Sequence, residues 1–107
     1  MAIQEIDAAE LDEALGQGAR LVDVREPHEY VGGHVAGAVL VPLRTVPEHV
    51  DAFRGDGPAY VICRSGSRSF KACEYLVQFG IDAVNVRGGM LAWMDADLPL
   101  VEGDQPT

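Results

Sequence analysis

The sequence Tyr60-Val-Ile-Cys63-Arg64-Ser65-Gly66-Ser67-Arg68-Ser69-Phe70-Lys71 passes from an apolar run to a cysteine, then to a short polar loop and a helical pattern. This order predicts a buried strand that ends at the cysteine and a helix that begins shortly after it. The thiol of Cys63 is then expected to face the amino end of that helix. Free backbone N–H groups and the helix dipole favour an anion there, so the position favours a thiolate.

Positive charge gathers around this cysteine. Arg64, Arg68 and Lys71 are three of the chain's eight Lys and Arg residues, although the whole chain has a formal net charge of -9. The local charge therefore runs against the overall composition. We interpret the segment as a nucleophilic thiolate with an anion-binding loop, rather than as an inert buried cysteine, the commoner fate of a free thiol.

Short apolar runs alternate with helical patterns on both sides of this segment. Strands are expected over 3–6, 21–24, 38–41, 59–62 and 83–86, and helical segments are expected over 7–15, 26–30, 45–53, 67–79 and 90–94. This alternation predicts an α/β fold with a mainly parallel sheet. Ligands of such sheets bind beyond the carboxyl ends of the strands, which is where Cys63 lies.

Length and composition limit the organisation of the chain. With 107 residues, of which 48% are hydrophobic, it is expected to form one domain over 1–107, with a core over about 3–99. The acidic segment 100–107 ends the chain, and we expect a frayed tail from Leu98 onward.

The charge and the apolar pattern also exclude several classes of function. Seventeen acidic against eight basic residues argue against binding to nucleic acid or to an anionic membrane. We find neither a signal peptide nor a run of about 18 apolar residues that could span a bilayer. Two cysteines are too few for a disulfide framework, which favours a reducing, cytoplasmic location.

Three segments resemble the rhodanese-like family, in the order in which that family has them. The first is Leu21-Val-Asp-Val-Arg-Glu-Pro-His-Glu-Tyr30 with Gly33-His-Val-Ala-Gly-Ala38. The second is Cys63-Arg-Ser-Gly-Ser-Arg-Ser69, which is similar to the family's active-site loop, and the third is Arg87-Gly-Gly-Met-Leu-Ala-Trp93. The resemblance covers roughly Ile6 to Pro99.

The resemblance implies a three-layer α/β/α sandwich around a five-stranded sheet, with thiosulfate sulfurtransferase chemistry on Cys63. The Cys-Arg-x-Gly-x-Arg loop is more similar to thiosulfate-using than to mercaptopyruvate-using members. Attack on thiosulfate needs a thiolate, an anion cradle and a persulfide intermediate, and it requires no metal and no organic cofactor. The expected partners are a small anionic sulfur donor and a thiol or cyanide acceptor.

The loop residues have complementary expected roles. Backbone N–H groups from Arg64 through Ser65, Gly66 and Ser67 to Arg68 can form a nest around the sulfur, and Gly66 permits the positive φ angle that this needs. The two arginines could orient the sulfonate of thiosulfate through charge-assisted hydrogen bonds. A thiol that stays protonated above neutral pH and is closed to solvent would contradict this hypothesis.

A phosphatase needs five residues between its cysteine and its arginine, to surround a tetrahedral oxyanion. In this chain Arg68 follows Cys63 with four residues between them, and Ser69 occupies the position that a phosphatase arginine would take. The loop would lack the main phosphate clamp. The spacing therefore favours sulfur transfer over phosphate hydrolysis.

Other candidate residues have two interpretations each. Asp23 and Arg25 follow a strand and either form an ion pair that braces a loop or supply positive potential near the substrate, and Arg87 has the same ambiguity. Cys73 shares an apolar helix face, which favours core packing over a redox role with Cys63. The three histidines, His28, His34 and His49, lack metal-ligand spacing, and we expect His34 to bond to local backbone.

Two functions remain open at this point. One is an enzyme that moves sulfane sulfur from thiosulfate to a thiol or to cyanide through a persulfide on Cys63. The other is a persulfide carrier or docking module that accepts sulfur from a cysteine desulfurase and passes it to a biosynthetic partner protein. A non-catalytic regulatory domain is disfavoured, because the cysteine and both loop arginines are present.

Overall fold

A computed structural model describes residues 2–107 and contains a five-stranded, wholly parallel sheet with the strand order β1-β5-β4-β2-β3. The expected α/β fold with a parallel sheet is confirmed. The strands are β1 (Gln4–Ile6), β2 (Arg20–Asp23), β3 (Val39–Leu40), β4 (Ala59–Ile62) and β5 (Ala83–Val86).

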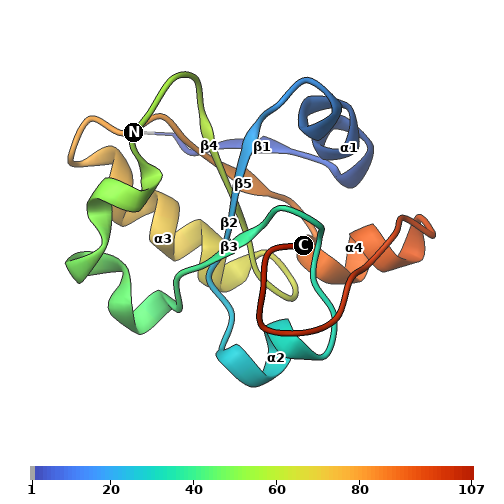
Figure 1. Ribbon diagram of the computed structural model, residues 1–107. Coiled ribbons are helices and arrows are strands. Elements are labelled where there is room, and N and C mark those ends of the chain that lie inside the picture. The colour runs from blue at the N-terminus through green and yellow to red at the C-terminus, as the bar shows by residue number, and fades with distance from the viewer. Residues whose placement is uncertain (1) are drawn as a thin grey trace.

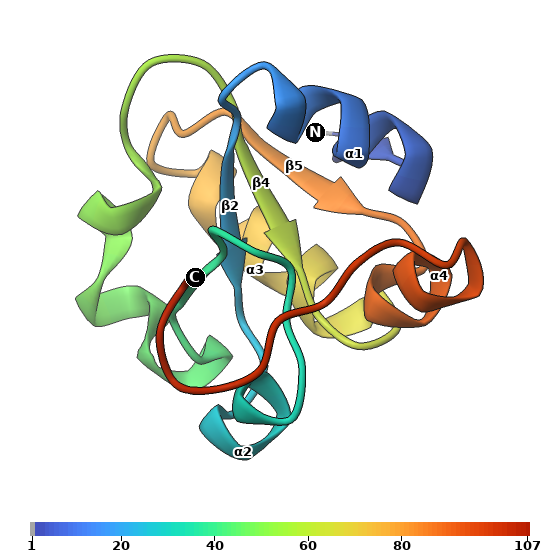
Figure 2. The same ribbon diagram turned by 45° about the vertical axis from the view of Figure 1, so that its right-hand side comes forward.

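Helices cover both faces of the sheet, so the chain forms the expected three-layer sandwich (Figures 1 and 2). On one face α3 packs with two short 3-10 helices, and on the other α1 and α4 lie side by side, with α2 below the sheet in these views. The α-helices are α1 (Ala8–Gly16), α2 (Pro27–Val31), α3 (Ser67–Val77) and α4 (Gly89–Asp95). No helix in residues 2–107 combines the length and apolarity that a bilayer crossing requires.

The segment 45–53 differs from the single helical segment expected there. It forms two 3-10 helices, η1 (Leu43–Glu48) and η2 (Val50–Phe53), and Pro47 lies inside the first. Proline has no backbone N–H to donate and its ring crowds the preceding turn, so this segment uses short pieces of the tighter helix.

The first helix begins where the sequence predicts. The Asp7 carboxylate accepts a hydrogen bond from the Glu10 backbone N–H, and the Glu10 carboxylate accepts one from the Asp7 N–H. This reciprocal capping satisfies two N–H groups that the helix cannot pair itself. It starts α1 with Leu11 facing the core.

The sheet is buried on both faces, as continuous apolar strands predict. One core cluster includes Val61, Cys73 and Leu76 on the α3 side. The second cluster includes Leu11 and Trp93 on the side of α1 and α4. Cys73 on α3 and Trp93 on α4 are therefore confirmed as core residues, whereas Leu91 and Met94 of the same apolar pattern on α4 are exposed.

The acidic C-terminal segment is ordered against the domain, so the expectation of a frayed tail was wrong. Val101 exchanges two backbone hydrogen bonds with His34, of 2.8 and 2.9 Å, as an isolated antiparallel bridge. The Gly103 N–H donates to the Val31 carbonyl at 3.0 Å. The tail runs beside α2 and the segment that precedes β3 (Figures 1 and 2). Its backbone partners are far away in the sequence, so its local composition did not reveal them.

Candidate active site

Cys63 follows the last residue of β4, and α3 begins four residues later at Ser67. The amino end of α4 holds the start of the connecting loop, because the Met90 N–H donates to the Cys63 carbonyl at 2.8 Å and the Leu91 N–H donates to the Arg64 carbonyl at 3.0 Å. Gly89 makes this approach possible: a Cβ on it would lie 2.4 Å from the Cys63 carbonyl oxygen. Two neighbouring strand ends thus build one loop cluster.

Three donors converge on the Cys63 sulfur. The Gly66 N–H donates to Sγ at 3.1 Å, the Ser69 N–H at 3.3 Å and the Ser69 hydroxyl at 3.2 Å. Hydrogen bonds to a sulfur anion favour the anion over the neutral thiol. The arrangement suits both a thiolate and a persulfide whose inner sulfur stays in place.

Ser69 is the functional candidate that the sequence reasoning missed. The nest was expected from the amides of residues 64 to 68, whereas Gly66 and Ser69 supply the donors. A signal was available, since Ser69 occupies the place of a phosphatase arginine and lies in the first turn of a helix that points at the sulfur. Its short hydroxyl side chain reaches that sulfur.

Gly66 adopts the positive φ angle that the sequence predicts. Its φ is +103°, and a Cβ at this position would approach the Gly88 nitrogen to 3.1 Å. Both the backbone conformation and the nearby β5–α4 connection therefore favour glycine here.

The sulfur is closed to solvent in this conformation. Cys63 is 0% exposed, whereas the loop residues Arg64, Ser65 and Ser67 are exposed. A thiol that is closed to solvent and also stays protonated above neutral pH would contradict the hypothesis of a reactive thiolate. The first of these two conditions is met in this conformation, and titration of the thiol tests the second. A donor molecule therefore reaches the sulfur only in a conformation that exposes it.

Arg68 forms a two-pronged ion pair with Glu29 of α2, with N···O distances of 2.7 and 2.9 Å. The hydrogen bonds from Arg68 lower the pKa of the Glu29 carboxyl from 4.5 to about 2. The same partner raises the pKa of Arg68. The arginine charge is thus largely neutralised within the protein, and its expected contact with a substrate sulfonate stays a prediction.

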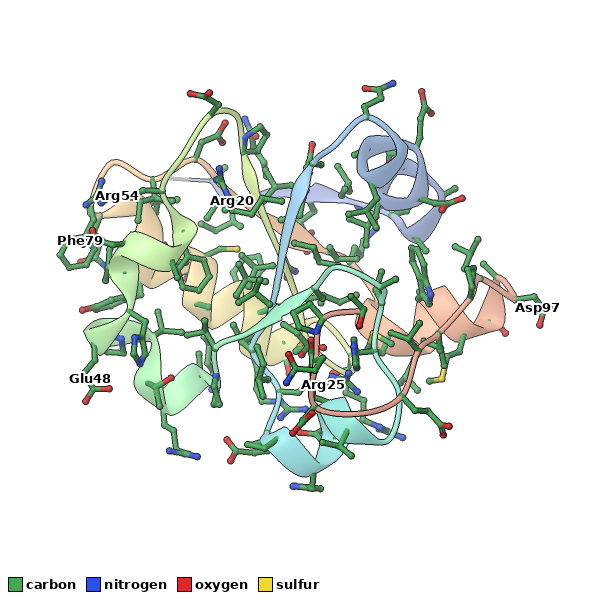
Figure 3. The ribbon with its side chains drawn as sticks, in the orientation of Figure 1. Arg20, Arg25, Glu48, Arg54, Phe79 and Asp97 are labelled. Carbon is green, nitrogen blue, oxygen red and sulfur yellow. The ribbon has the colours of Figure 1, made fainter. Side chains whose placement is uncertain are left out.

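Asp23 and Arg25 form a buried ion pair, which is the first of the two roles that the sequence left open for them. The Arg25 Nη2 lies 2.8 Å from an Asp23 carboxylate oxygen and donates also to the Gly33 carbonyl at 2.8 Å. Figure 3 shows Arg25 at the end of the sheet near α2, away from Arg20 and Arg54. The pair therefore fixes the connection after β2 and carries little net charge.

Arg64 and Arg87 are the exposed arginines of the two connections that build the site. Neither forms a salt bridge with any carboxylate in the described residues, 2–107. The Arg87 backbone N–H donates to the Ile6 carbonyl at 2.8 Å, which fixes the start of the β5–α4 connection. Their guanidinium groups are free to meet an anion.

Cys73 and His34 lie in structural positions. Burial raises the pKa of the Cys73 thiol from 9.0 to about 12, so this thiol is neutral at physiological pH. The His34 ring stacks on Tyr30 with ring centroids 3.7 Å apart, and its Nδ1 bonds to the Tyr30 carbonyl at 2.9 Å. Local backbone bonding of His34 is confirmed.

Comparisons with known proteins agree with this geometry. A family model described as rhodanese-like domain matches residues 7–96. A sulfurtransferase of Allochromatium vinosum is 37% identical, over 92% of this chain and 95% of the relative. The thiosulfate sulfurtransferase GlpE of Stutzerimonas stutzeri is 34% identical over 82% of each chain. A crystal structure of a rhodanese-related protein from Thermoplasma volcanium superposes with a TM-score of 0.86 at 35% identity, covering 92% of this chain and 97% of the other.

Proposed function

This chain belongs to the rhodanese-like family, and on that premise we propose that Cys63 takes sulfane sulfur from thiosulfate and passes it to a thiol or to cyanide. At the coarser level the chain is a rhodanese-like sulfurtransferase. The choice of thiosulfate as donor rests on the loop chemistry and on the similarity to a relative that carries thiosulfate in its name.

The first step is a displacement at sulfur. The Cys63 thiolate attacks the outer sulfur of thiosulfate, a Cys–S bond to that sulfur forms, and the sulfur–sulfur bond of thiosulfate breaks. Sulfite leaves with the electron pair, and Cys63 is left as a persulfide anion. In the second step a thiolate or cyanide attacks the outer sulfur, which regenerates the Cys63 thiolate and gives an acceptor persulfide or thiocyanate.

The convergence of three donors on Sγ is the observation that carries this proposal. Donors fixed by α3 hold the sulfur anion without a paired histidine as base. The exposed Arg64 and Arg87 guanidiniums supply positive charge at the rim for a dianionic donor, in a protein that is otherwise acidic.

The same contacts argue against phosphate hydrolysis. A phosphatase arginine would stand where Ser69 donates to the sulfur, and the arginine one position earlier, Arg68, is held by Glu29. The donors of Gly66 and Ser69 are therefore directed at the Cys63 sulfur, and Arg68 is not free to hold a tetrahedral oxyanion.

A persulfide carrier that receives sulfur from a cysteine desulfurase is the second candidate function. Two exposed apolar side chains of α4, Leu91 at 41% and Met94 at 43%, favour it. They lie beside the loop, because the Leu91 N–H donates to the Arg64 carbonyl. Such a surface suits contact with a partner protein. The chemistry on Cys63 would be the same, with specificity set by the interface.

Mass spectrometry of the intact protein after incubation with thiosulfate tests the proposal. We expect one added sulfur atom on the parent chain and on Cys73→Ala, and no addition on Cys63→Ser. An adduct that survives in Cys63→Ser would refute the assignment of the nucleophile. Slow loading by thiosulfate together with rapid loading by a cysteine desulfurase would favour the carrier function over the enzyme.

A further inference from the structure

Asn85 is a polar side chain buried in the middle of the sheet. It belongs to β5, which pairs with β1 on one side and with β4 on the other, and it is 1% exposed. Side chains alternate along a strand, so Asn85 shares its face with Ala83, which packs in the core cluster on the α3 side. It therefore lies beneath the helix whose amino end carries the sulfur cradle.

The Asn85 amide links the sheet edge to the cysteine loop. Its Nδ2 donates to the Gly66 carbonyl at 3.2 Å and to the Glu5 carboxylate at 2.8 Å. Gly66 is the residue whose N–H donates to the Cys63 sulfur. Gly66 is thus the only residue between the Asn85 amide and the Cys63 sulfur in this series of hydrogen bonds. The Glu5 carboxylate of β1 accepts the other hydrogen bond from the amide.

The two partners fix the orientation of the amide. Both are acceptors, so a flipped amide would place its oxygen against two other oxygens. The cost of the chosen orientation is that the buried Oδ1 has no partner in residues 2–107. A side chain that served only to fill space would avoid this cost if it were apolar.

Gly66 needs such a restraint more than other residues would. Glycine has the widest backbone freedom, and the φ of +103° is only one of the conformations open to it. A hydrogen bond to its carbonyl restrains the peptide plane that follows Gly66, which limits the φ and ψ angles open to the residue. The Gly66 N–H on the preceding plane is then held in its direction toward Sγ. The Phe70 N–H, which donates to the same carbonyl at 3.2 Å, adds a second restraint from α3.

We propose that Asn85 is a positioning residue for the cysteine site, which acts by holding Gly66 so that its N–H remains on the Cys63 sulfur, and that Glu5 keeps the amide in the required orientation. The inference rests on the proposed function only in taking Cys63 as the reacting sulfur. It assigns to β5 and β1 a part in the site that the loop sequence does not reveal.

The test is a titration of the thiolate by its ultraviolet absorbance, with the corresponding Cys63→Ser protein as baseline. Cys73, whose pKa is about 12, stays neutral over the range used. In Asn85→Asp the ionised side chain has no hydrogen to donate to Gly66 and adds a charge beside Glu5. We expect its thiolate signal to appear about one pH unit higher than in the parent, and a smaller upward shift in Asn85→Leu.

Asn85→Leu removes the donor without adding charge, so its shift separates the lost hydrogen bond from the electrostatic effect of a new carboxylate. Gln78→Glu, at the exposed carboxyl end of α3, controls for the change in net charge. It should leave the titration unchanged, and a shift equal to that of Asn85→Asp would overturn the proposal in favour of a long-range charge effect. A titration of folded Asn85→Asp that superimposes on the parent would also overturn it.

Glu5→Ala keeps the proposal falsifiable if the Asn85 variants fail to fold, because Glu5 is exposed on the edge strand. We expect faster hydrogen exchange at the Gly66 amide, and unchanged exchange there would refute the proposal. Loading by thiosulfate is measured separately. If thiosulfate adds no sulfur to the parent protein but the Asn85 variants still shift the thiolate titration, the proposed function is rejected and the role of Asn85 stands.

Discussion

Arg68 and Glu29, which lie 39 residues apart in the sequence, form a two-pronged ion pair that joins α3 to α2 beside the cysteine loop. The pair ties the first signature segment of the chain to the loop that carries the nucleophile. It also removes most of the charge of the one loop arginine that is half-buried. Positive charge for a substrate is thereby left to the exposed arginines.

Glu29→Gln should lower stability in a pH-dependent manner. The pKa of Glu29 falls from 4.5 to about 2 on folding, so its contribution is fully present above about 4.5 and is lost as the pH falls toward 2. We expect the free energy of unfolding of parent and variant to differ by about 1 kcal/mol at neutral pH and to converge near pH 2. Urea unfolding at several pH values measures this difference. Asp51→Asn, which breaks an exposed pair with Arg54, is the control and should change little.

Ser69→Ala should slow the loading of Cys63 with sulfur. The substitution removes the hydroxyl that donates to Sγ at 3.2 Å and keeps the backbone N–H that donates beside it. Because the lost hydrogen bond is made to a charged group, we expect a decrease on the order of tenfold in the loading rate. Ser67→Ala, at an exposed position of the same helix turn, should load at the parent rate. Equal rates for the two variants would contradict the role given to the hydroxyl.

Cys73 should remain unmodified in the native protein. Burial holds its pKa near 12, so at pH 8 almost none of it is thiolate, the form that reacts with alkylating agents. We expect iodoacetamide to label Cys73 only after denaturation, as read by peptide mass spectrometry. Rapid labelling of Cys73 in folded protein would show that the helix face opens, and would revive a redox role for it.

Gly89→Ala should displace the cysteine loop. The added Cβ would lie 2.4 Å from the Cys63 carbonyl oxygen and 2.6 Å from that of Arg64, so backbone must move. We expect loss of most sulfur loading. Gly80→Ala is the matched control, because Gly80 also has a positive φ but an added Cβ meets nothing within 4 Å. Both variants carry the conformational cost of about 1 kcal/mol, so only the clash separates them. Similar loading by the two would contradict the close approach.

Removal of residues 100–107 should destabilise the domain. It deletes the two backbone hydrogen bonds between Val101 and His34, the one from the Gly103 N–H to Val31 and the one from the Gly37 N–H to Pro106. At about 1 kcal/mol for each bond, less the entropy regained by the tail, we expect a loss of about 1 to 3 kcal/mol in the free energy of unfolding. Deletion of Thr107 alone, which is exposed, is the control. If the truncated protein is as stable as the parent, the tail contributes nothing to stability, as expected for a frayed tail.

The sequence by itself determined the α/β class, the parallel sheet and the place of Cys63 at the end of β4. These features depend on local signals, namely apolar runs of strand length, helix periodicity and the glycine at position 66, so they can be read along the chain. Family resemblance added the five-stranded sandwich and the chemistry, and the family and fold were confirmed.

Only the tertiary structure decided which groups act on that cysteine and its loop. Glu29, the partner of Arg68, lies 39 residues from it in the sequence, and Asn85 lies 19 residues from its partner Gly66. Val101 of the C-terminal tail pairs with His34. Ser69 is close in sequence, yet its hydroxyl reaches the sulfur only because the first turn of α3 aims it there. Contacts of this kind depend on how elements pack in three dimensions, which local periodicity does not encode.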